Sequence, residues 1–441
     1  MTTTAQVVVV GAGIAGISAA YDLAVRRGVD GVVIVDPRPP LTLTSDKSTE
    51  CYRNHWPNRP MVSLMNRSID LLEAVSEQSG NAIGLNRRGY LFVTADPHRL
   101  QQLEAGAQVS SRHGAGPVRH HREPGTFGTS PDGLDIFHGP DVLLDAFPFV
   151  TNEAVGALYV QRAGWLSAQQ LGMWMLDRIR ESGGSLLADE VIGIEIENDQ
   201  VRAVRVQSNE SIRCGIVVNA AGPLSPRVAS MVGLDLPISS ELHLKVAFGD
   251  HLGVVPRDAP LFIWSDRQTI PWEKDEAKAL RDAGRRELTE EMPVFCHGRP
   301  EGGAGSPYLL ALWEYHDDRR EPEWPIPEDP LYTEVVLRGL TTMVPGMARY
   351  LDRLPRSTVD GGYYSKTPEN RPLIGPAGLR GFHLMAGMSG FGVMVSAGAA
   401  DLLGAHITGG SLPEYADVFL LDRYQDPAYL AAISDTDTGQ L

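Results

Sequence analysis

Cysteine is scarce in this chain of 441 residues, and none of it is clustered. Cys51, Cys214 and Cys296 lie far apart in the sequence, and no Cys-x-x-Cys pair occurs. This spacing disfavours a disulfide framework and a cysteine zinc site. Isolated thiols fit a reducing compartment, so we expect a cytoplasmic protein.

Positive charge and long apolar runs are also in short supply. Lys and Arg number 39 against 55 Asp and Glu, which gives a formal net charge of −16 at pH 7. An acidic chain is a poor partner for nucleic acid or for an anionic membrane. No apolar run approaches the length of a bilayer span, and no basic start precedes a cleavage site. We therefore expect no nucleic acid, no membrane and no export signal.

Metal-ligand patterns are weak as well. His316 stands next to Asp317 and Asp318, but no fourth ligand follows at a useful spacing. We therefore expect no bound metal. The composition is otherwise that of an ordinary globular protein, with 43% hydrophobic residues and enough length for two domains.

A nucleotide-binding turn stands at the start of the chain. The apolar run Val7–Val10 ends in Gly11, Gly13 and Gly16, and a helical stretch follows over residues 14–26. Gly11 permits a tight turn, Gly13 removes a side chain that would block a diphosphate, and Gly16 lets the helix pack on the strand. Free amides and the positive dipole end of the helix then face the phosphates.

The next strand supplies an acid at the expected distance. Val32–Val35 leads to Asp36, about 20 residues past the last glycine, where a carboxylate can accept both ribose hydroxyls. Strand, glycines, helix, strand and terminal acid in this order predict a bound dinucleotide.

The remaining chain alternates helical and strand-like patterns. Helical periodicity is found over residues 61–78, 168–181 and 393–407, and strand patterns are found around 89–94, 191–196, 201–207, 216–218, 243–248 and 309–313. The charged stretch 272–291 predicts a solvated surface helix. After Gly410 we expect a loosely attached coil with one helical turn.

Four segments share one order and spacing. The first is the glycine turn, and the second is Gly164–Leu166 with its following helix and the strand entering at Val191. The third is the strand end 217–223 (VVNAAGP), and the fourth is the pair 367–375 (TPENRPLIG) and 386–392 (AGMSGFG). Together they resemble the D-amino-acid oxidase superfamily of flavoproteins, which includes glycine oxidase and sarcosine oxidase.

The resemblance implies an α/β fold of two interleaved domains. A Rossmann-like FAD-binding domain of the GR2 type would comprise residues 1–80, 156–235 and 346–441. A mainly antiparallel sheet would form the substrate domain from residues 81–155 and 236–345.

The resemblance also implies FAD, held without a covalent bond. Amides at the start of the last helix can stabilise negative charge at the flavin N1/C2 carbonyl. The residues expected to bind FAD lie in the turn, the following loop, the adenine strand, the VVNAAG end and the last helix: Gly11, Gly13, Ile14, Ala15, Gly16, Asp36, Arg38, Thr44, Ser45, Lys47, Val191, Ala220, Ala221, Gly222, Gly390, Phe391, Gly392, Val393 and Met394.

Departures from the family pattern concern the flavin tether and the substrate. The cysteine that tethers the flavin in sarcosine oxidase corresponds to Gly362, and nothing in the context of His55 argues for a bond there. The lysine and arginine that hold the substrate carboxylate in sarcosine oxidase and glycine oxidase correspond to Met394 and Tyr364. The histidine of the family motif is Phe391.

Three residues are therefore our catalytic candidates. Tyr364 lies on the substrate side in the family, where it would hydrogen-bond a substrate oxygen, or else it is buried against the sheet. Either Lys366, Arg53 or Lys47 supplies the missing cation, or the substrate is not a plain α-amino acid. Lys366 equally fits an ordinary surface lysine, and Arg53 equally fits a brace that pairs with Glu50.

The resemblance implies oxidation of a C–N bond in an amine or amino-acid-like substrate. A hydride would pass to flavin N5, and the resulting imine would be hydrolysed. Oxygen or an electron carrier would reoxidise the flavin; the absence of lysine from 309–316 favours slow oxidase activity or another acceptor. The alternatives are a flavin-dependent monooxygenase or tailoring enzyme, and a flavin-binding protein without turnover. The oligomeric state does not follow from the sequence.

Overall fold

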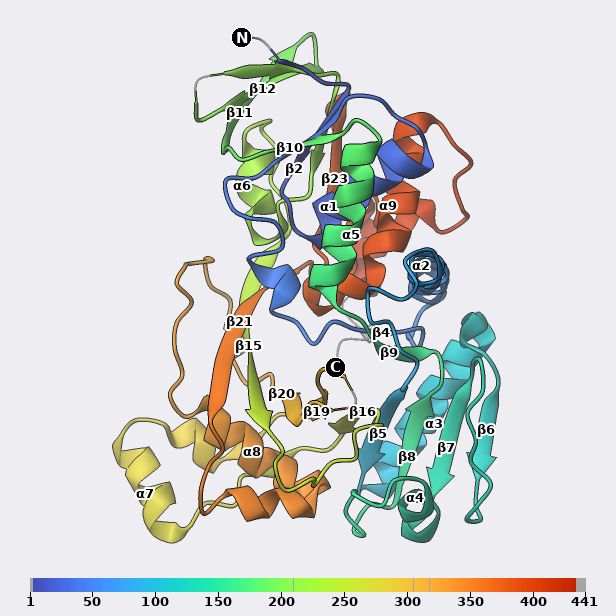
Figure 1. Ribbon diagram of the computed structural model, residues 1–441, viewed down its shortest axis with the longest axis vertical. Helices are drawn as coiled ribbons and strands as arrows, with labels where there is room; N and C mark the ends of the chain where they lie inside the picture. The colour runs from blue at the N-terminus through green and yellow to red at the C-terminus, as the bar shows by residue number, and fades with distance from the viewer. Residues whose placement is uncertain (1–2, 209, 304, 317, 434–441) are drawn as a thin grey trace.

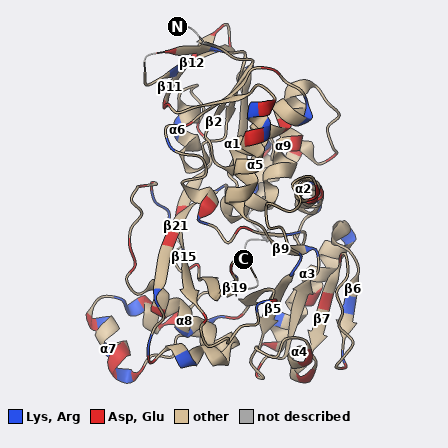
Figure 2. Ribbon diagram, in the orientation of Figure 1, with Lys and Arg blue, Asp and Glu red and all other residues tan. Residues whose placement is uncertain are grey.

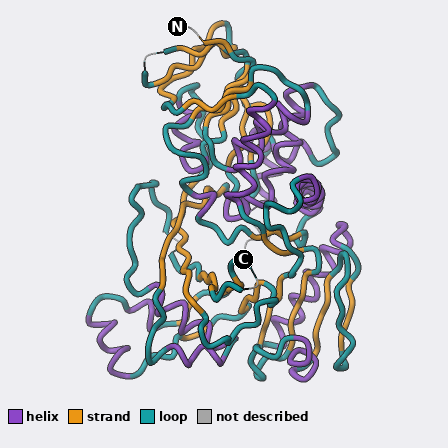
Figure 3. The backbone as a smooth tube through the Cα atoms, in the orientation of Figure 1, coloured by secondary structure: helices purple, strands orange, loops and turns teal. Residues whose placement is uncertain are grey.

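The computed structural model describes residues 3–208, 210–303, 305–316 and 318–433, which form two lobes (Figure 1). The upper lobe in Figure 1 contains a mostly parallel sheet with helices packed on it. The lower lobe contains a long mixed sheet, with helices and loops around it (Figure 3). Segments from distant parts of the chain lie side by side in each lobe (Figure 1).

The parallel sheet carries the nucleotide turn at its centre. Its strand order is β10–β3–β2–β14–β23–β22, and only the edge strand β22 runs antiparallel to its neighbour among the described residues. The strands are β10 (Ser185–Leu187), β3 (Val32–Val35), β2 (Val7–Val10), β14 (Ile216–Asn219), β23 (Phe382–Ala386) and β22 (Leu373–Pro376). The associated helices are α1 (Ile14–Tyr21), α5 (Ala168–Glu181), α6 (Ser225–Ser230) and α9 (Gly392–Thr408).

Two smaller sheets accompany this lobe. One has the order β1–β13–β12–β11, with β1 (Thr3–Thr4), β13 (Ser211–Arg213), β12 (Gln200–Val206) and β11 (Val191–Glu197). The other pairs β4 (Cys51–Arg53) with β9 (Ala163–Trp165).

The long sheet of the lower lobe has the order β21–β15–β20–β19–β16–β5–β8–β7–β6. Its strands are β21 (Ser357–Lys366), β15 (Ser239–Gly249), β20 (Tyr308–Leu312), β19 (Cys296–Pro300), β16 (Leu261–Trp264), β5 (Tyr90–Thr94), β8 (Gly156–Val160), β7 (Leu134–His138) and β6 (Val118–His121). Most neighbours are antiparallel, so the α/β fold class with a mainly antiparallel second sheet is confirmed. Strands β8 and β21 belong to this sheet although their residues fall in the ranges assigned to the FAD-binding domain.

The described part of the lower lobe also includes the helices α3 (Pro97–Ser110), α4 (Pro140–Ala146), α7 (Lys274–Asp282) and α8 (Tyr332–Met343). A short antiparallel pair forms between β17 (Gln268–Thr269) and β18 (Glu291–Met292), which are connected through α7. Helix α7 carries charges of both signs (Figure 2) and buries none of its residues, which confirms the expected surface helix. Trp264 and Trp313 are buried in the core, whereas Tyr308 is exposed.

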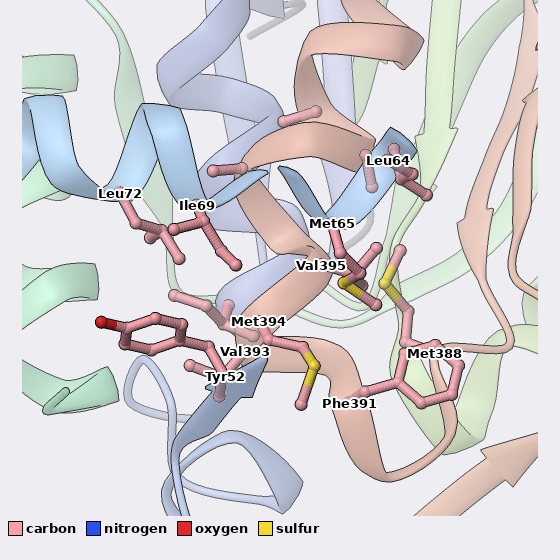
Figure 4. Packing of buried hydrophobic residues seen from close by; sticks show 14 of the residues in the cluster. Tyr52, Leu64, Met65, Ile69, Leu72, Met388, Phe391, Val393, Met394 and Val395 are labelled. Atoms are coloured by element: carbon pink, nitrogen blue, oxygen red, sulfur yellow. The ribbon is translucent and has the colours of Figure 1, made fainter. Parts of the chain in front are cut away.

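Helix α9 lies at the centre of the largest apolar core. Leu64, Met65, Ile69 and Leu72 of α2 (Arg59–Gln78) face the segment that begins α9 (Figure 4). The helices approach closely because a Cβ at Gly398 would lie 2.7 Å from the Leu64 carbonyl oxygen.

One expectation about apolar runs was wrong. Residues 389–408 have a mean hydropathy of 1.3 and are long enough to cross a membrane, but 72% of this window is buried inside the protein. The run is apolar because other helices surround it on several sides.

The expectation of a loose C-terminal coil was also wrong for the described residues up to Ile433. Arg423 is buried, and its guanidinium lies 2.7 Å from a carboxylate oxygen of the equally buried Glu369. Tyr424 and Tyr429 donate hydrogen bonds to the same carboxylate, and α10 (Pro427–Ile433) follows. The charged and aromatic residues of this segment suggest a solvent-exposed tail when only the sequence is considered. In the folded protein they form hydrogen bonds and an ion pair with one another in the interior.

Cations of the long sheet bind the loop between β3 and β4. Lys245 Nζ donates to the carbonyl oxygens of Asp46 and Ser48, at 2.7 and 3.2 Å. Arg299, which is 1% exposed, donates from Nε to the Thr49 carbonyl oxygen at 2.9 Å. The two lobes are therefore joined by buried charge-assisted hydrogen bonds.

Glu50 follows this loop in a constrained position. Its φ is +57°, its carboxylate accepts a hydrogen bond from the Ala168 amide at 2.7 Å, and it lies 3.6 Å from Arg299. The brace that Glu50 makes is therefore to Arg299 and not to Arg53. Burial raises the pKa of Glu50 to about 7, although Arg299 acts in the opposite direction.

Replacing Arg423 by Met should destabilise the protein strongly. The variant leaves the Glu369 carboxylate buried without its cation, a change that costs about 3–5 kcal/mol in other buried pairs. Urea unfolding measures the loss. The control is Arg59→Met, whose partner Glu414 is 89% exposed, and which should change the free energy of unfolding by less than about 1 kcal/mol. Equal effects of the two variants would contradict a buried anchor.

Glu50→Gln should remove a pH dependence of stability. The folded chain keeps the Glu50 proton up to about pH 7, whereas the unfolded chain loses it near pH 4.5. Stability therefore falls as pH rises through this window, by up to about 3 kcal/mol, and the variant lacks this fall. Urea unfolding at pH 5 and pH 8 compares the slopes, with the exposed Glu414→Gln as control. Identical slopes for Glu50→Gln and the parent would refute the effect.

Candidate active site

The glycine turn has the geometry that its sequence predicts. Gly11 adopts φ +108°, and a Cβ there would lie 2.5 Å from the Ala220 carbonyl oxygen. A Cβ at Gly16 would lie only 1.9 Å from the Gly11 carbonyl oxygen. Main chain therefore packs directly on main chain at both positions, and any side chain would separate β2, α1 and β14.

Polar side chains tie the turn to its surroundings. Asp36, at the end of β3, accepts hydrogen bonds from the amides of Ala12 and Arg38 at 2.8 and 2.9 Å. Ser45 accepts one from the Ile14 amide at 2.9 Å. The carboxylate and the hydroxyl thus stand beside the amides at the start of α1, where an anionic group is favoured.

One cavity of about 370 Å³ extends from this turn to the start of α9. It is lined by most of the predicted cofactor residues, namely Gly11, Gly13, Ile14, Ala15, Asp36, Arg38, Thr44, Ser45, Val191, Ala220, Ala221, Gly222, Gly390, Gly392 and Val393. The first turns of both helices meet the cavity, and no N-cap side chain covers them, because α1 begins after Gly13 and the Phe391 side chain before α9 makes no capping bond. A long ligand with a diphosphate at one end and a flat polar ring at the other fits this lining.

Four predicted cofactor residues do not line the cavity. Gly16 faces the strand, and Lys47 lies 2.6 Å from Asp360 in an ion pair. Phe391 packs edge-on against Trp56, with ring centroids 5.0 Å apart. Met394 points into the apolar core beside α2 (Figure 4).

The sequence patterns missed several residues that do line the cavity. These include Pro223, Arg227, Met231, Tyr363, Ser365 and Met388. Each of these residues stands within or near a motif, so the motifs located the site correctly. Which side chains beside a motif face the cavity depends on strand pairing and on the rotation of each helix about its axis.

The catalytic candidates lie in three different environments. Tyr364 lines the cavity and its ring packs against the backbone of Gly390, where a Cβ would lie 2.4 Å from the Tyr364 ring. Lys366 lies 2.5 Å from Glu241 in an ion pair. Arg53 is 5% exposed, and its guanidinium lies 4.6 Å from the centroid of the Trp56 ring.

The position of the family's tethering cysteine is closely packed. A Cβ at Gly362 would lie 2.9 Å from the Cα atom of Thr44, so a larger residue there would displace the loop. His55 is half-buried, its Nδ1 lies 3.0 Å from the Ser110 hydroxyl, and desolvation lowers its pKa to about 3.

A row of titratable side chains on the long sheet faces the upper lobe. Leu242, Leu244 and Val246 of β15 pack into the core beside α8, so the alternating residues Glu241, His243 and Lys245 point the other way. On neighbouring strands, Arg299 faces the same side, as its bond to the loop shows. Sequence reasoning missed this row, although the alternation Glu-Leu-His-Leu-Lys-Val was its signal.

Two histidine groups bear on metal binding. His316 Nε2 lies 3.1 Å from Asp329, which also pairs with Arg285, and Asp317 lies outside the described residues. Elsewhere Glu104, His120 and His138 stand close enough to share an ion. The facing ring nitrogens of the last two are 3.0 Å apart, which is the distance of a direct hydrogen bond between imidazoles.

Comparison with known proteins gives relatives over nearly the whole chain. Mouse mitochondrial dimethylglycine dehydrogenase is 23% identical over 417 residues, which are 93% of this chain and 43% of that protein. Mouse mitochondrial sarcosine dehydrogenase is 23% identical over 93% of this chain and 40% of its own length. The chain thus spans less than half the length of these curated relatives.

Solved structures share the fold. L-proline dehydrogenase from P. horikoshii has a TM-score of 0.75 at 20% identity, covering 96% of this chain and 99% of its own. Glycine oxidase from Geobacillus kaustophilus has a TM-score of 0.74 at 16% identity, covering 95% and 99%.

The family of FAD-dependent oxidoreductases known as DAO matches residues 6–406. This range includes the glycine turn, both ends of the cavity and the long sheet. The resemblance seen in the sequence is thereby confirmed, and with it FAD as the cofactor and an oxidoreductase as the kind of enzyme. The chain belongs to the DAO family of FAD-dependent oxidoreductases.

Proposed function

We propose that the chain oxidises a C–N bond of an amino-acid-like substrate, using FAD held without a covalent bond in the cavity described above. One observation carries the proposal: a single cavity joins the nucleotide turn to the α9 start and to Tyr364. The curated relatives are named for dimethylglycine and sarcosine, which favours an N-substituted amino acid as substrate. The packing at Gly362 supports a non-covalent cofactor.

The chain's own residues would hold the cofactor at both ends. The amides at the α1 start, with Ser45 and Asp36 beside them, would bind the diphosphate and the ribose. Amides at the α9 start would favour negative charge on the flavin ring. Bound FAD would supply hydride acceptance at N5, which turns the amine into an imine.

Arg53 is one candidate cation for a substrate carboxylate, although it does not stand among the residues that line the cavity. All three candidate cations have partners within the protein: Lys47 pairs with Asp360, Lys366 pairs with Glu241, and Arg53 donates a hydrogen bond to the His55 carbonyl oxygen at 3.4 Å. The guanidinium of Arg53 lies among the rings of Trp56, Tyr90 and Phe92. Such aromatic surroundings exclude water and strengthen an ion pair with a ligand. Burial of Tyr364 raises its pKa well above the ordinary value, so its hydroxyl keeps a proton to donate.

Oxygen or an electron carrier would reoxidise the flavin. The stretch 309–316 has no lysine, but Lys245 lies on the neighbouring strand β15 and faces the upper lobe. Peroxide yield compared with dye reduction distinguishes an oxidase from a dehydrogenase.

Substrate amines should bleach the flavin without any other reductant. The FAD-loaded protein is mixed anaerobically with N-methylated amino acids, primary amino acids, simple amines and NAD(P)H, and absorbance near 450 nm is followed. We expect bleaching by at least one amino acid. Bleaching by NAD(P)H alone would point to a monooxygenase, and no bleaching by any compound would point to a flavin-binding protein without turnover.

Arg53→Gln should weaken binding of substrates that carry a carboxylate. Loss of a charge-assisted hydrogen bond of about 1.5–3 kcal/mol raises KM about 10- to 150-fold, while Arg53→Lys should recover part of the loss. Amines of the same size without a carboxylate are the control, since their KM should change little. An equal rise for both kinds of substrate would show that Arg53 acts on the fold and not on the carboxylate.

A further inference from the structure

His243 occupies a place in the long sheet that is built around its ring. It is paired with Gly362 of β21, and Tyr364 stands two pairs further along, on the same face of the sheet and opposite Glu241. Because Gly362 has no side chain, the backbone of Thr44 packs against the sheet at this position, and no side chain of β21 stands directly opposite His243. Diagonal neighbours in an antiparallel pair are close enough for two aromatic rings to meet.

The two rings lie almost face to face. Their centroids are 3.9 Å apart, and the ring planes differ by 14°. A cation above the face of a tyrosine is attracted to it, so a protonated His243 would strengthen this stacked contact.

Both ring nitrogens face a carboxylate. Nε2 lies 3.5 Å from Glu241, and Nδ1 lies 3.5 Å from Glu314, which follows β20. Only the protonated imidazole can present N–H groups on both sides. Glu241 in turn pairs with Lys366, so acids and bases alternate along the row.

The other titratable groups around His243 are consistent with this assignment. Burial lowers the pKa of His243, but the charges of Glu314 and Glu241 outweigh it, and the pKa is raised overall. Burial raises the pKa of Glu314, yet His243 brings it down to about 2. His297 on β19 is also buried, which lowers its pKa, so it adds no proton to the row.

The ring of Tyr364 is thus held from two sides. His243 covers one face, and the backbone of Gly390 bounds the ring edge at the cavity wall. We propose that His243 is a charged positioning residue, clamped as an imidazolium between Glu241 and Glu314, which fixes the phenol of Tyr364 at the substrate end of the cavity. This inference rests on the proposed function in one respect, namely that Tyr364 contacts the substrate.

The first test reads the charge directly and needs no substrate. In FAD-loaded protein with ¹⁵N-labelled histidine, both ring nitrogens of His243 should be protonated at pH 7, where an ordinary histidine with a pKa near 6.5 is mostly neutral. His243→Gln identifies the signal by its loss. Glu314→Gln should shift the signal toward the neutral form. The control is His383, a buried histidine of β23 whose pKa burial lowers to about 4. A neutral His243 at pH 7 would overturn the proposal.

The second test is a double-mutant cycle with Tyr364. His243→Gln and Tyr364→Phe should each lower kcat about 10- to 100-fold, the effect of a misplaced group, while KM changes less than about threefold. The double variant should be no slower than the slower single variant, because His243 acts through Tyr364. Glu314→Gln serves as a second variant if His243→Gln folds poorly, and His383→Gln is the control. Additive losses would show an independent role and contradict the proposal.

The two tests separate the two claims. If no amine reduces the flavin, the proposed function fails, but the nitrogen signals of His243 and the flavin absorption bands are still measurable. Under the inference, Tyr364→Phe and the double variant should then have the same flavin spectrum. Different spectra would refute the coupling, whatever the reaction is.

Discussion

The contact of main chain with main chain at the nucleotide turn is the constraint on which the rest of the structure depends. The carbonyl oxygens of Gly11 and Ala220 lie where the Cβ atoms of larger residues at Gly16 and Gly11 would be. This approach aligns β2 with β14 and sets the α1 start against the strand ends. Since β14 also pairs with β23, the chain that leaves β23 enters α9 on the same side. The two helix starts therefore meet one cavity because β2, β14 and α1 are packed without side chains between them at a single point.

Buried charges provide the second level of organisation. Arg299, Lys245 and His243 come from the long sheet and are all largely removed from water. Each is compensated by carbonyl oxygens or carboxylates, which a buried cation requires. Since the acceptors of Lys245 and Arg299 belong to the loop after the nucleotide turn, the same bonds fix that loop against the sheet. For Lys245 and Arg299, these hydrogen bonds form only when the two lobes are correctly placed, so the cost of burying the two cations favours that placement.

Local signals in the sequence predicted local structure well. Helix α5 spans the residues 168–181 expected from periodicity and the flanking glycines, and the turn glycines have the contacts deduced from their spacing. Prediction failed where long-range pairing decides. The pair Arg423–Glu369 joins residues 54 apart, so the tail looked solvated. Likewise, the neighbours of His243 are Glu314 and Tyr364 on other strands, and no local pattern shows which strands lie side by side. The apolar stretch of α9 is ambiguous on its own, because a core helix and a membrane helix have the same composition.

Strand β21 has a mechanical consequence for motion between the lobes. Its first half pairs with β15 at the edge of the long sheet, while Tyr363, Tyr364 and Ser365 near its end line the cavity. Residues 367–372 then lead directly to β22 of the other sheet. A hinge opening between the lobes would have to bend this strand and break the backbone pairing of Glu241 with Tyr364. The continuous chain through β21 and β22 therefore opposes such a motion and keeps the cavity wall in register with both sheets.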